Sequence, residues 1–311
     1  MLDILIPTYN RRSYVVSNIA YLQREITKHN LDNLVKIIVS DNFSDDGTYE
    51  ALQGQDPVPY MKVIQQKENV GLERNALSIL NEATSQYVMY LGDDDQVPEG
   101  YLKIVVERLS KNPSIGVVIP GVAARYSEGK DIPVRGGGQK ERLVNNGFYS
   151  QLVYGYLTHQ LSGCVFKRDG LYDAYEHIGR YKNIYPFIFF ALHCQQTSST
   201  LYLPQMKVAV LEGNKKDWAY NTVGLLDEIS NNYNAIFGKN SLKISLCLIL
   251  ICIKQSWRLR TNSIQYHAMA ISSIMKMSTF RLPFKFIVIP TMLPFLVKNI
   301  ASAYLGRDNE K

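Results

Sequence analysis

The chain has 311 residues, 46% of them hydrophobic and 20% charged, which is ordinary for a globular protein with one large domain or two smaller ones. Its four cysteines are scattered, and this spacing excludes a disulfide framework and a zinc site and favours buried, reduced thiols. An apolar, strand-like run begins at residue 2 with no basic segment before it, so we expect no secretory signal.

The excess positive charge lies in the C-terminal quarter. The net charge is +6, yet residues 1–238 carry 23 basic and 26 acidic side chains, whereas 239–298 carry nine Lys and Arg and no Asp or Glu. The apolar runs 242–253 and 286–297 are shorter than the ~20 residues of a spanning helix. Either run alone also fits a core helix. Together with the charge they predict helices in a membrane interface that face anionic lipids; with no recognition-helix or RNA-binding signature, we predict no nucleic-acid partner.

The first 120 residues alternate between two hydrophobic periods. Helical patterns lie between runs of strand length, and the runs occupy residues 2–6, 35–40, 60–65, 86–91 and 115–119. The helical patterns occupy residues 13–28, 46–53, 71–83 and 98–110. This alternation predicts an α/β fold with a doubly wound, mostly parallel sheet and helices on both faces. Ligands of such sheets bind beyond the carboxyl ends of the strands.

The rest of the chain is less regular. Gly129, Gly136-Gly137-Gly138 and Gly147, set among charged residues in 121–150, predict a long mobile loop that serves as a lid. A tyrosine-rich segment follows over 148–190, then a short strand near 206–211. From residue 222 onward the pattern is helical, over 222–237, 241–261, 264–277 and 284–303.

Three consecutive carboxylates, Asp93-Asp94-Asp95, follow the apolar run 87–91 and a glycine. Neighbouring like charges repel by roughly 1 kcal/mol per close pair in water, and by more where water is scarce. A divalent cation such as Mg²⁺ or Mn²⁺ relieves this repulsion, because hard cations prefer oxygen ligands. The alternative is a solvated acidic turn.

Polar segments also follow the first three predicted strands. Pro7 is expected to end the first strand, Thr8 and Tyr9 can bond a nucleoside, and Arg11 can meet a phosphate, although a plain β–α turn looks similar. We expect Asn10 or Ser13 to cap the helix that follows.

After the second predicted strand, Ser44 or Asp45 can cap the next helix. Asp41 is then left either to accept a hydrogen bond from the N–H of a uracil or thymine ring, or to serve as a second turn carboxylate. After the third strand, Gly71 permits a tight turn before a helix whose N–H groups favour phosphate, and Arg74 lies in its first turn. The alternative is a surface helix start.

Taken in order, these segments resemble the family 2 glycosyltransferases with the GT-A fold, bacterial enzymes that build O-antigen, capsule and related glycans. The segments are Pro7-Thr8-Tyr9-Asn10-Arg11, Ser40-Asp41-Asn42 with Ser44 to Thr48, Asn69-Val70-Gly71 with Arg74-Asn75, and Leu91-Gly92-Asp93-Asp94-Asp95. The resemblance is strong over 1–120 and looser over 121–215. It implies a nucleotide-sugar-binding half over 1–120, an acceptor-binding half over 121–220 and a helical, membrane-associated region over 221–311.

The resemblance also implies roles for single residues. The donor pocket would be lined by Pro7, Thr8, Tyr9, Arg11, Asp41, Asn69, Gly71, Arg74, Asp93 and Asp94. Asp93 and Asp95 would hold Mg²⁺ or Mn²⁺ against the diphosphate of a UDP- or dTDP-linked sugar. The acceptor would be a lipid-linked oligosaccharide at the cytoplasmic face of the bacterial inner membrane.

One family feature is missing. Many inverting relatives carry a Glu-Asp pair whose carboxylate acts as general base, whereas this chain has Ile184-Tyr185-Pro186 at the expected position. The candidate bases are instead Asp173, Glu176, Asp169, His159 and His193. The missing pair leaves open a catalytically inactive homologue that scaffolds an assembly complex. A nucleotidyltransferase lacks support because no Gly-rich basic loop follows the first strand, and a dehydrogenase because no G-x-G-x-x-G follows any strand.

A polar loop after the last predicted strand adds three weaker candidates. Lys215 or Lys216 can reach a diphosphate, and Trp218 can stack on a sugar, with a solvated turn as the alternative.

Overall fold

The computed structural model describes residues 1–54, 58–126, 131–179, 183, 185–212, 224–254 and 271–290. The chain divides into two compact units. The first consists of Met1–Arg180 with Phe190–Lys215, and the second of Tyr181–Phe189 with Lys216–Lys311.

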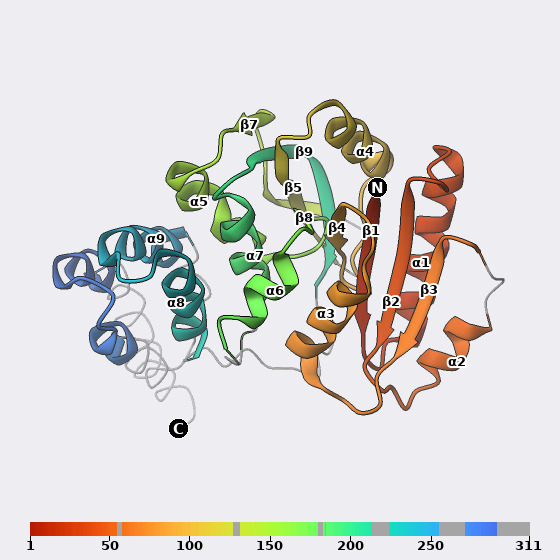
Figure 1. Cartoon of the computed structure of the whole chain (residues 1–311), viewed down its shortest axis with the longest axis horizontal. Helices are drawn as coiled ribbons and strands as arrows, with labels where there is room; N and C mark the ends of the chain where they lie inside the picture. The colour runs from red at the N-terminus through yellow and green to blue at the C-terminus, as the bar shows by residue number, and fades with distance from the viewer. Residues whose placement is uncertain are drawn as a thin grey trace, which may run out of the picture. The chain divides into compact units, whose positions relative to one another are not determined.

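The first unit is built on a nine-stranded sheet in the order β3-β2-β1-β4-β8-β5-β9-β7, with β6 paired to β5 (Figure 1). Strands β1 to β5 and β9 run in one direction, and β6, β7 and β8 run against them. The strands are β1 (Leu2–Thr8), β2 (Val35–Asp41), β3 (Met61–Gln65), β4 (Tyr87–Tyr90), β5 (Ile115–Arg125), β6 (Asp131–Arg135), β7 (Arg142–Val144), β8 (Val165–Lys167) and β9 (Ser199–Leu211). The prediction of an α/β fold with a mostly parallel sheet is confirmed.

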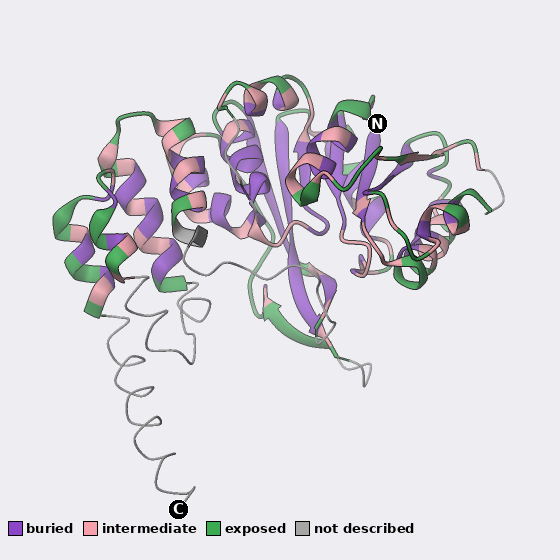
Figure 2. Cartoon of the chain, turned by 90° about the horizontal axis from the view of Figure 1, so that it is seen from below, coloured by how far each residue is buried: buried purple, intermediate pink, exposed green. Residues whose placement is uncertain are grey.

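Helices cover both faces of this sheet. They are α1 (Arg12–Lys28), α2 (Thr48–Gln53), α3 (Gly71–Glu82), α4 (Tyr101–Lys111), α5 (Phe148–Tyr154), α6 (Leu171–Glu176) and α7 (Pro186–Cys194), with a 3₁₀ turn at Gly155–His159. Leu2, Ile4 and Ile6 of β1 share one apolar cluster with α1 and α4. Leu5 points to the other face because side chains alternate along a strand, and α3 contacts β1 and β2. The burial of these central strands is visible in Figure 2.

The elements predicted over the first 120 residues are confirmed, with one small correction. Strand β1 continues past Pro7, which is paired with Ser40 in the parallel ladder, and ends at Thr8. Thr8 lies opposite Asp41, so the two polar segments that follow β1 and β2 leave the sheet side by side.

The prediction of a mobile lid over 121–150 is wrong for most of that segment. Strand β5 runs on to Arg125, β6 and β7 follow, and α5 begins at Phe148, while 127–130 lie outside the described residues. Gly136, and Gly121 at the start of the segment, permit close backbone approach instead. A Cβ on Gly121 or on Gly136 would lie 2.3 Å from the carbonyl oxygen of Pro204. The predicted short strand at 206–211 is the second half of β9, whose pairing with β5 shifts register at Pro120/Gly121.

The second unit is helical over its described residues. It contains α8 (Gly224–Phe237), α9 (Ser241–Lys254) and helical segments at 271–276 and 282–290. Asn232 of α8 donates to the carbonyl of Tyr185 at 3.1 Å and accepts from the amide of Asn183 at 2.7 Å, which fixes the start of α7 against α8. The parts of the predicted helices that fall in 255–270 and 291–303 lie outside the described residues. So do Lys215, Lys216 and Trp218. None of the helices within the described ranges has the length and apolarity to span a bilayer.

Candidate functional site

The acidic segment after β4 contacts the loop that follows β1. The Thr8 hydroxyl donates to Asp93 Oδ2 at 2.7 Å, and Arg11 Nη1 lies 3.2 Å from Asp94 Oδ2. Both contacts follow from topology, because β1 and β4 are parallel neighbours whose carboxyl ends meet at one edge of the sheet. Residues separated by more than 80 positions thus form one polar cluster.

Asp95 faces a different part of the unit. It is buried, with 9% of its surface exposed, and accepts hydrogen bonds from the Ser162 hydroxyl and, at 3.2 Å, from the backbone N–H of Leu211. Asp95 therefore joins the acidic segment to the turn before β8 and to the end of β9. Gly92 is required beside it, because a Cβ there would lie 2.8 Å from Asp95 Oδ2.

Asn18, which no sequence motif singled out, supports the acidic segment. Its buried side-chain amide donates to the carbonyls of Gly92 at 3.1 Å and Asp93 at 3.4 Å, so α1 fixes the backbone of the acidic segment. The signal was present in the sequence, since Asn18 lies on the apolar face of α1 beside the buried Val15 and Ile19. A polar residue on such a face needs a partner.

Burial first, and then the charge of Asp94, raise the pKa of Asp93 to about 7. The hydrogen bond from Thr8 and the positive charge of Arg11 act in the opposite direction but do not cancel these effects. Asp93 is therefore protonated in part of the molecules near neutral pH. A cation bound beside it would favour the ionised form.

Asp41 is fully buried at the end of β2. Its carboxylate accepts from the backbone N–H of Ser44 at 3.1 Å, from the Ser44 hydroxyl and from the Gln65 amide at 3.2 Å. Asp41 thus shapes the turn that follows it, which matches the alternative of a turn carboxylate. Its predicted contact with a nucleobase stays a prediction.

The capping predictions for the first two helices are wrong, because one carboxylate from the β2–α2 loop serves both. Asp46, and not Ser44 or Asp45, accepts from the backbone N–H of Thr48 in α2 at 3.0 Å. Its other oxygen accepts from the backbone N–H of Arg12 at the start of α1 at 3.1 Å. Asn10 or Ser13 had been expected to cap this helix.

Asn10 instead links the same two loops. It has a positive φ of 53°, its backbone N–H donates to Ser44 Oγ at 2.8 Å, and its side-chain oxygen accepts from the backbone N–H of Asp45 at 3.0 Å. Asparagine tolerates this left-handed conformation better than most residues. Tyr9, the neighbouring pocket candidate, is half-buried.

The loops after β2 and β3 meet through paired amides. Asn42 Nδ2 donates to Asn69 Oδ1 at 2.9 Å, and Asn69 Oδ1 also accepts from the backbone N–H of Gly71 at 3.0 Å. Gly71 begins α3 with a φ of +81°, so the predicted tight turn is confirmed. The strand order places these loops on the same edge as Thr8 and Asp93.

Arg74 and Glu176, predicted for separate roles, lie together. Arg74 Nη1 is 3.1 Å from Glu176 Oε1, with 38% and 33% of the side chains exposed. Beside this ion pair, Tyr175 donates to Glu73 Oε1 at 2.7 Å, so α6 is joined to α3 by two contacts.

The other candidate bases are dispersed in the first unit. Asp173 and Asp169 are exposed, and His159 Nδ1 lies 2.7 Å from the carbonyl of Tyr156. Burial lowers the pKa of His193 in α7. These positions do not single out one of the four side chains, so the general base stays unassigned.

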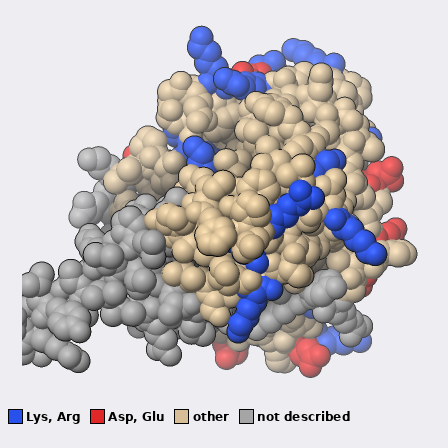
Figure 3. Space-filling model, turned by 90° about the vertical axis from the view of Figure 1, so that its left-hand side faces the viewer, with Lys and Arg blue, Asp and Glu red and all other residues tan. Residues whose placement is uncertain are grey.

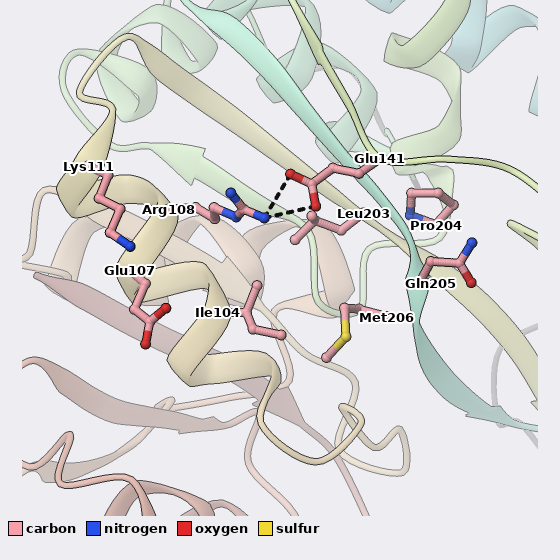
Figure 4. Close-up of a pocket in the computed structure, with 9 residues that line it drawn as sticks. All are labelled: Ile104, Glu107, Arg108, Lys111, Glu141, Leu203, Pro204, Gln205 and Met206. Carbon is pink, nitrogen blue, oxygen red and sulfur yellow. Dashed lines mark hydrogen bonds and ion pairs between the residues drawn. The ribbon is translucent and has the colours of Figure 1, made fainter.

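A separate cavity of about 340 Å³ lies between α4 and the middle of β9 (Figure 4). Ile104, Leu203 and Met206 give it apolar walls, and Arg108 pairs with Glu141 at 3.0 Å at its margin. None of the predicted site residues lines it. We therefore place the candidate site at the sheet edge and not in this cavity.

An α/β sheet with polar loops gathered at its carboxyl edge is the architecture of the GT-A nucleotide-sugar-binding fold, and comparison with known proteins agrees. Residues 3–173, more than half of the 311-residue chain, match the family described as Glycosyl transferase family 2. The chain belongs to this family and is a glycosyltransferase.

A curated relative and two solved structures are similar to this chain. The relative, GalNAc(5)-diNAcBac-PP-undecaprenol beta-1,3-glucosyltransferase of Campylobacter jejuni, is 27% identical over 114 residues, and the match spans 35% of each protein. S. aureus TarS in complex with UDP-GlcNAc has a TM-score of 0.71 at 12% identity, over 98% of this chain and 92% of that one. Mannosyltransferase PcManGT from Pyrobaculum calidifontis, in complex with GDP-Man and Mn²⁺, has a TM-score of 0.55 at 14% identity, over 97% and 86%. At these identities the structures establish the fold.

Proposed function

We propose that this glycosyltransferase uses Mg²⁺ or Mn²⁺ to move a sugar from a UDP- or dTDP-linked donor to a lipid-linked oligosaccharide in the synthesis of bacterial surface polysaccharide such as O-antigen or capsule. The observation that carries the proposal is the convergence of the β1 and β4 loops, in which Thr8 and Arg11 contact Asp93 and Asp94. Family membership supplies the reaction class.

The side chains at this edge fit a metal held jointly with substrate. Within the described part of the chain, no three His, Cys, Asp or Glu side chains form a metal-binding group. Mg²⁺ and Mn²⁺ sites in phosphate-handling enzymes often use one or two carboxylates and complete their shell with phosphate oxygens and water. Asp93 and Asp95 would supply those carboxylates, since a carboxylate has about four acceptor sites and can bind a cation while it accepts hydrogen bonds such as those from Thr8 and Ser162.

When bound, the cation would neutralise charge on the departing diphosphate. The protein adds its own groups at the same edge. Arg11 beside Asp94, Arg74 and the N–H groups at the start of α3 would attract the phosphates, while Asp41 and Thr8 lie at adjacent strand ends where the nucleoside would bind. Asn18 and Ser162 would hold the acidic segment in place.

The acceptor assignment rests on the named relative and on the charge of the chain. The Campylobacter enzyme is named for a substrate attached to undecaprenol by a diphosphate. A lipid-linked acceptor lies at a membrane surface, and the only excess of positive charge in this chain is in 239–298. We accordingly propose a peripheral position at the cytoplasmic face of the bacterial inner membrane.

A donor panel tests the proposal. Thermal unfolding is measured with UDP-, dTDP- and GDP-linked sugars, each with and without Mn²⁺, and donor hydrolysis is followed without acceptor. We expect one uracil or thymine nucleotide sugar to stabilise the protein only together with the metal, and to be hydrolysed slowly. Stabilisation without hydrolysis or transfer would favour the inactive scaffolding homologue. No stabilisation by any donor would refute both the transferase with a UDP- or dTDP-linked donor and the inactive homologue that binds a nucleotide sugar.

A further inference from the structure

The helical segment 282–290 exposes its apolar side chains and buries its lysine. Leu282, Phe286 and Ile287 are 55%, 63% and 51% exposed, whereas Lys285 is only 6% exposed. Leu282 and Phe286 are four residues apart and therefore lie on one helix face, next to Ile287. A surface helix of a water-soluble unit normally has the opposite arrangement.

Internal contacts of the second unit fix this orientation. Lys285 Nζ donates to the carbonyl of Met275 at 2.7 Å, at the end of the helical segment 271–276, where a cation is favourable. The backbone N–H of Arg281 donates to Ser245 Oγ at 2.9 Å, and its Nε donates to Ser241 Oγ at 2.8 Å. The segment is thus anchored to α9 and to 271–276, and the fully buried Val288 marks its inner face.

The apolar face extends onto the neighbouring elements, and the charged side chains next to it in the sequence are cations, whereas the carboxylate of Asp227 in α8 accepts from Ser273 at 3.2 Å. Leu242 of α9 and Met275 are 43% and 44% exposed, and both adjoin the anchoring contacts. Lys276 and Arg281 are exposed beside them. No Asp or Glu occurs in 239–298. In Figure 3, blue side chains are spread over the side of the molecule shown, and the red ones lie at its margins.

We propose that Leu282, Phe286 and Ile287 insert into the headgroup layer of an anionic phospholipid bilayer, with Lys276 and Arg281 beside the phosphates. Shallow insertion of one helix face needs exposed apolar side chains together with positive charge, and this surface has both. Nucleic acid would match the charge but not the apolar side chains, and a partner protein would match the apolar side chains without requiring the excess of Lys and Arg in 239–298. This inference deepens the proposed membrane position and rests on it, but it concerns the second unit alone and does not depend on the donor site.

The test is sedimentation of the full chain with vesicles. One set of vesicles contains phosphatidylglycerol and the other only phosphatidylcholine. We expect binding to the anionic vesicles, weakened at about 0.5 M salt because the charges are then screened. The double variant Phe286→Ser with Ile287→Ser should bind at least about tenfold more weakly, since each side chain contributes burial of apolar surface. The matched control is Val134→Ser, which changes a side chain 62% exposed on β6.

Circular dichroism of each variant establishes that it is folded. Equal vesicle binding by the wild type and the double variant would overturn the proposal. A second contrary result would be that the wild type binds no vesicles but forms an oligomer that the double variant does not form, because this indicates a protein partner. A third would be that RNA displaces the protein from vesicles by binding the same side chains. Because no donor is present, none of these outcomes bears on the proposed transfer reaction.

Discussion

The acidic edge of the sheet and the basic C-terminal segment differ in how their charges are arranged. At the edge, Asp93, Asp94 and Asp95 follow β4, and each contacts a different side chain: Thr8 and Arg11 from the end of β1 and its loop, and Ser162 from the turn before β8. In 239–298 the charges all have one sign, and the apolar side chains between them are exposed at Leu282 and Phe286.

This difference indicates the kind of ligand that each region suits. A converging site suits a small, compact ligand, because few groups must meet at one point and their desolvation strengthens each interaction. A surface with dispersed charges suits an extended partner, because each cation or apolar side chain contributes a small, separate part of the binding free energy. The following predictions test the converging half of this comparison.

The largest expected effect is at Asp95. Asp95→Asn removes a charge from the proposed cation site, so we expect sugar transfer measured with Mn²⁺ to fall at least about 100-fold. The exposed Asp32→Asn provides the control and should keep full activity. Thermal unfolding of both variants separates lost chemistry from lost contacts to Ser162 and Leu211. Full transfer by the wild type in EDTA would contradict the metal assignment.

The general base should give the next largest effect. Alanine is placed in turn at Asp173, Glu176, Asp169, His159 and His193, and both kcat and donor affinity are measured. We expect one variant to lose about 100-fold in kcat with unchanged donor affinity, because proton transfer contributes about that much. Uniformly mild effects would place the base elsewhere.

Glu176 needs its own control because it pairs with Arg74. This ion pair is partly exposed, so Glu176→Gln should change the free energy of unfolding by less than about 1 kcal/mol. A large loss of kcat in Glu176→Gln at unchanged stability would assign chemistry to the carboxylate rather than to the link between α6 and α3.

A smaller effect is expected at Thr8. Thr8→Val removes the hydroxyl that donates to Asp93, and we expect metal-dependent donor binding, measured by calorimetry, to weaken about tenfold. Thr8→Ser keeps the hydroxyl and should bind normally. If both variants bind as the wild type does, the contact has no part in donor binding.

The smallest effect concerns stability without metal. The pKa of Asp93 is about 7 in the folded protein against 3.8 ordinarily, so the folded state binds the proton more tightly and the free energy of unfolding falls as pH rises between these values. Asp93→Asn cannot ionise. We expect it to be more stable than the wild type by on the order of 1 kcal/mol at pH ~8, and by less at pH ~5, in urea unfolding with EDTA. A gain independent of pH would show that Asp93 is not the titrating group.

The local pattern was enough for the first 120 residues because their strands are mostly apolar and their helices have one apolar face. It failed at 121–150, where glycines such as Gly136 suggested mobility. Gly136, like Gly121, is instead needed for close contact with Pro204, more than 60 residues away, and a close approach of distant backbone leaves no local signal.

For the candidate site, too, the sequence predicted some features and not others. The order of motifs predicted that Thr8, Arg11, Gly71 and the acidic triplet lie at one edge, because strand ends of a parallel sheet share an edge, and the structure places them there. It did not identify the support given by Asn18, or the pairing of Arg74 with Glu176. Those contacts depend on how α1 and α6 pack, which periodicity does not specify.

The sequence by itself determined the α/β class, the family and the edge at which the polar loops meet, since each follows from local patterns and their order along the chain. Only the tertiary structure decided which side chain contacts each carboxylate and that Asp46 accepts hydrogen bonds at the starts of both α1 and α2. It also decided that Phe286 is exposed and Lys285 is buried. These outcomes depend on side chains that meet across large sequence separations, where packing and desolvation decide the arrangement.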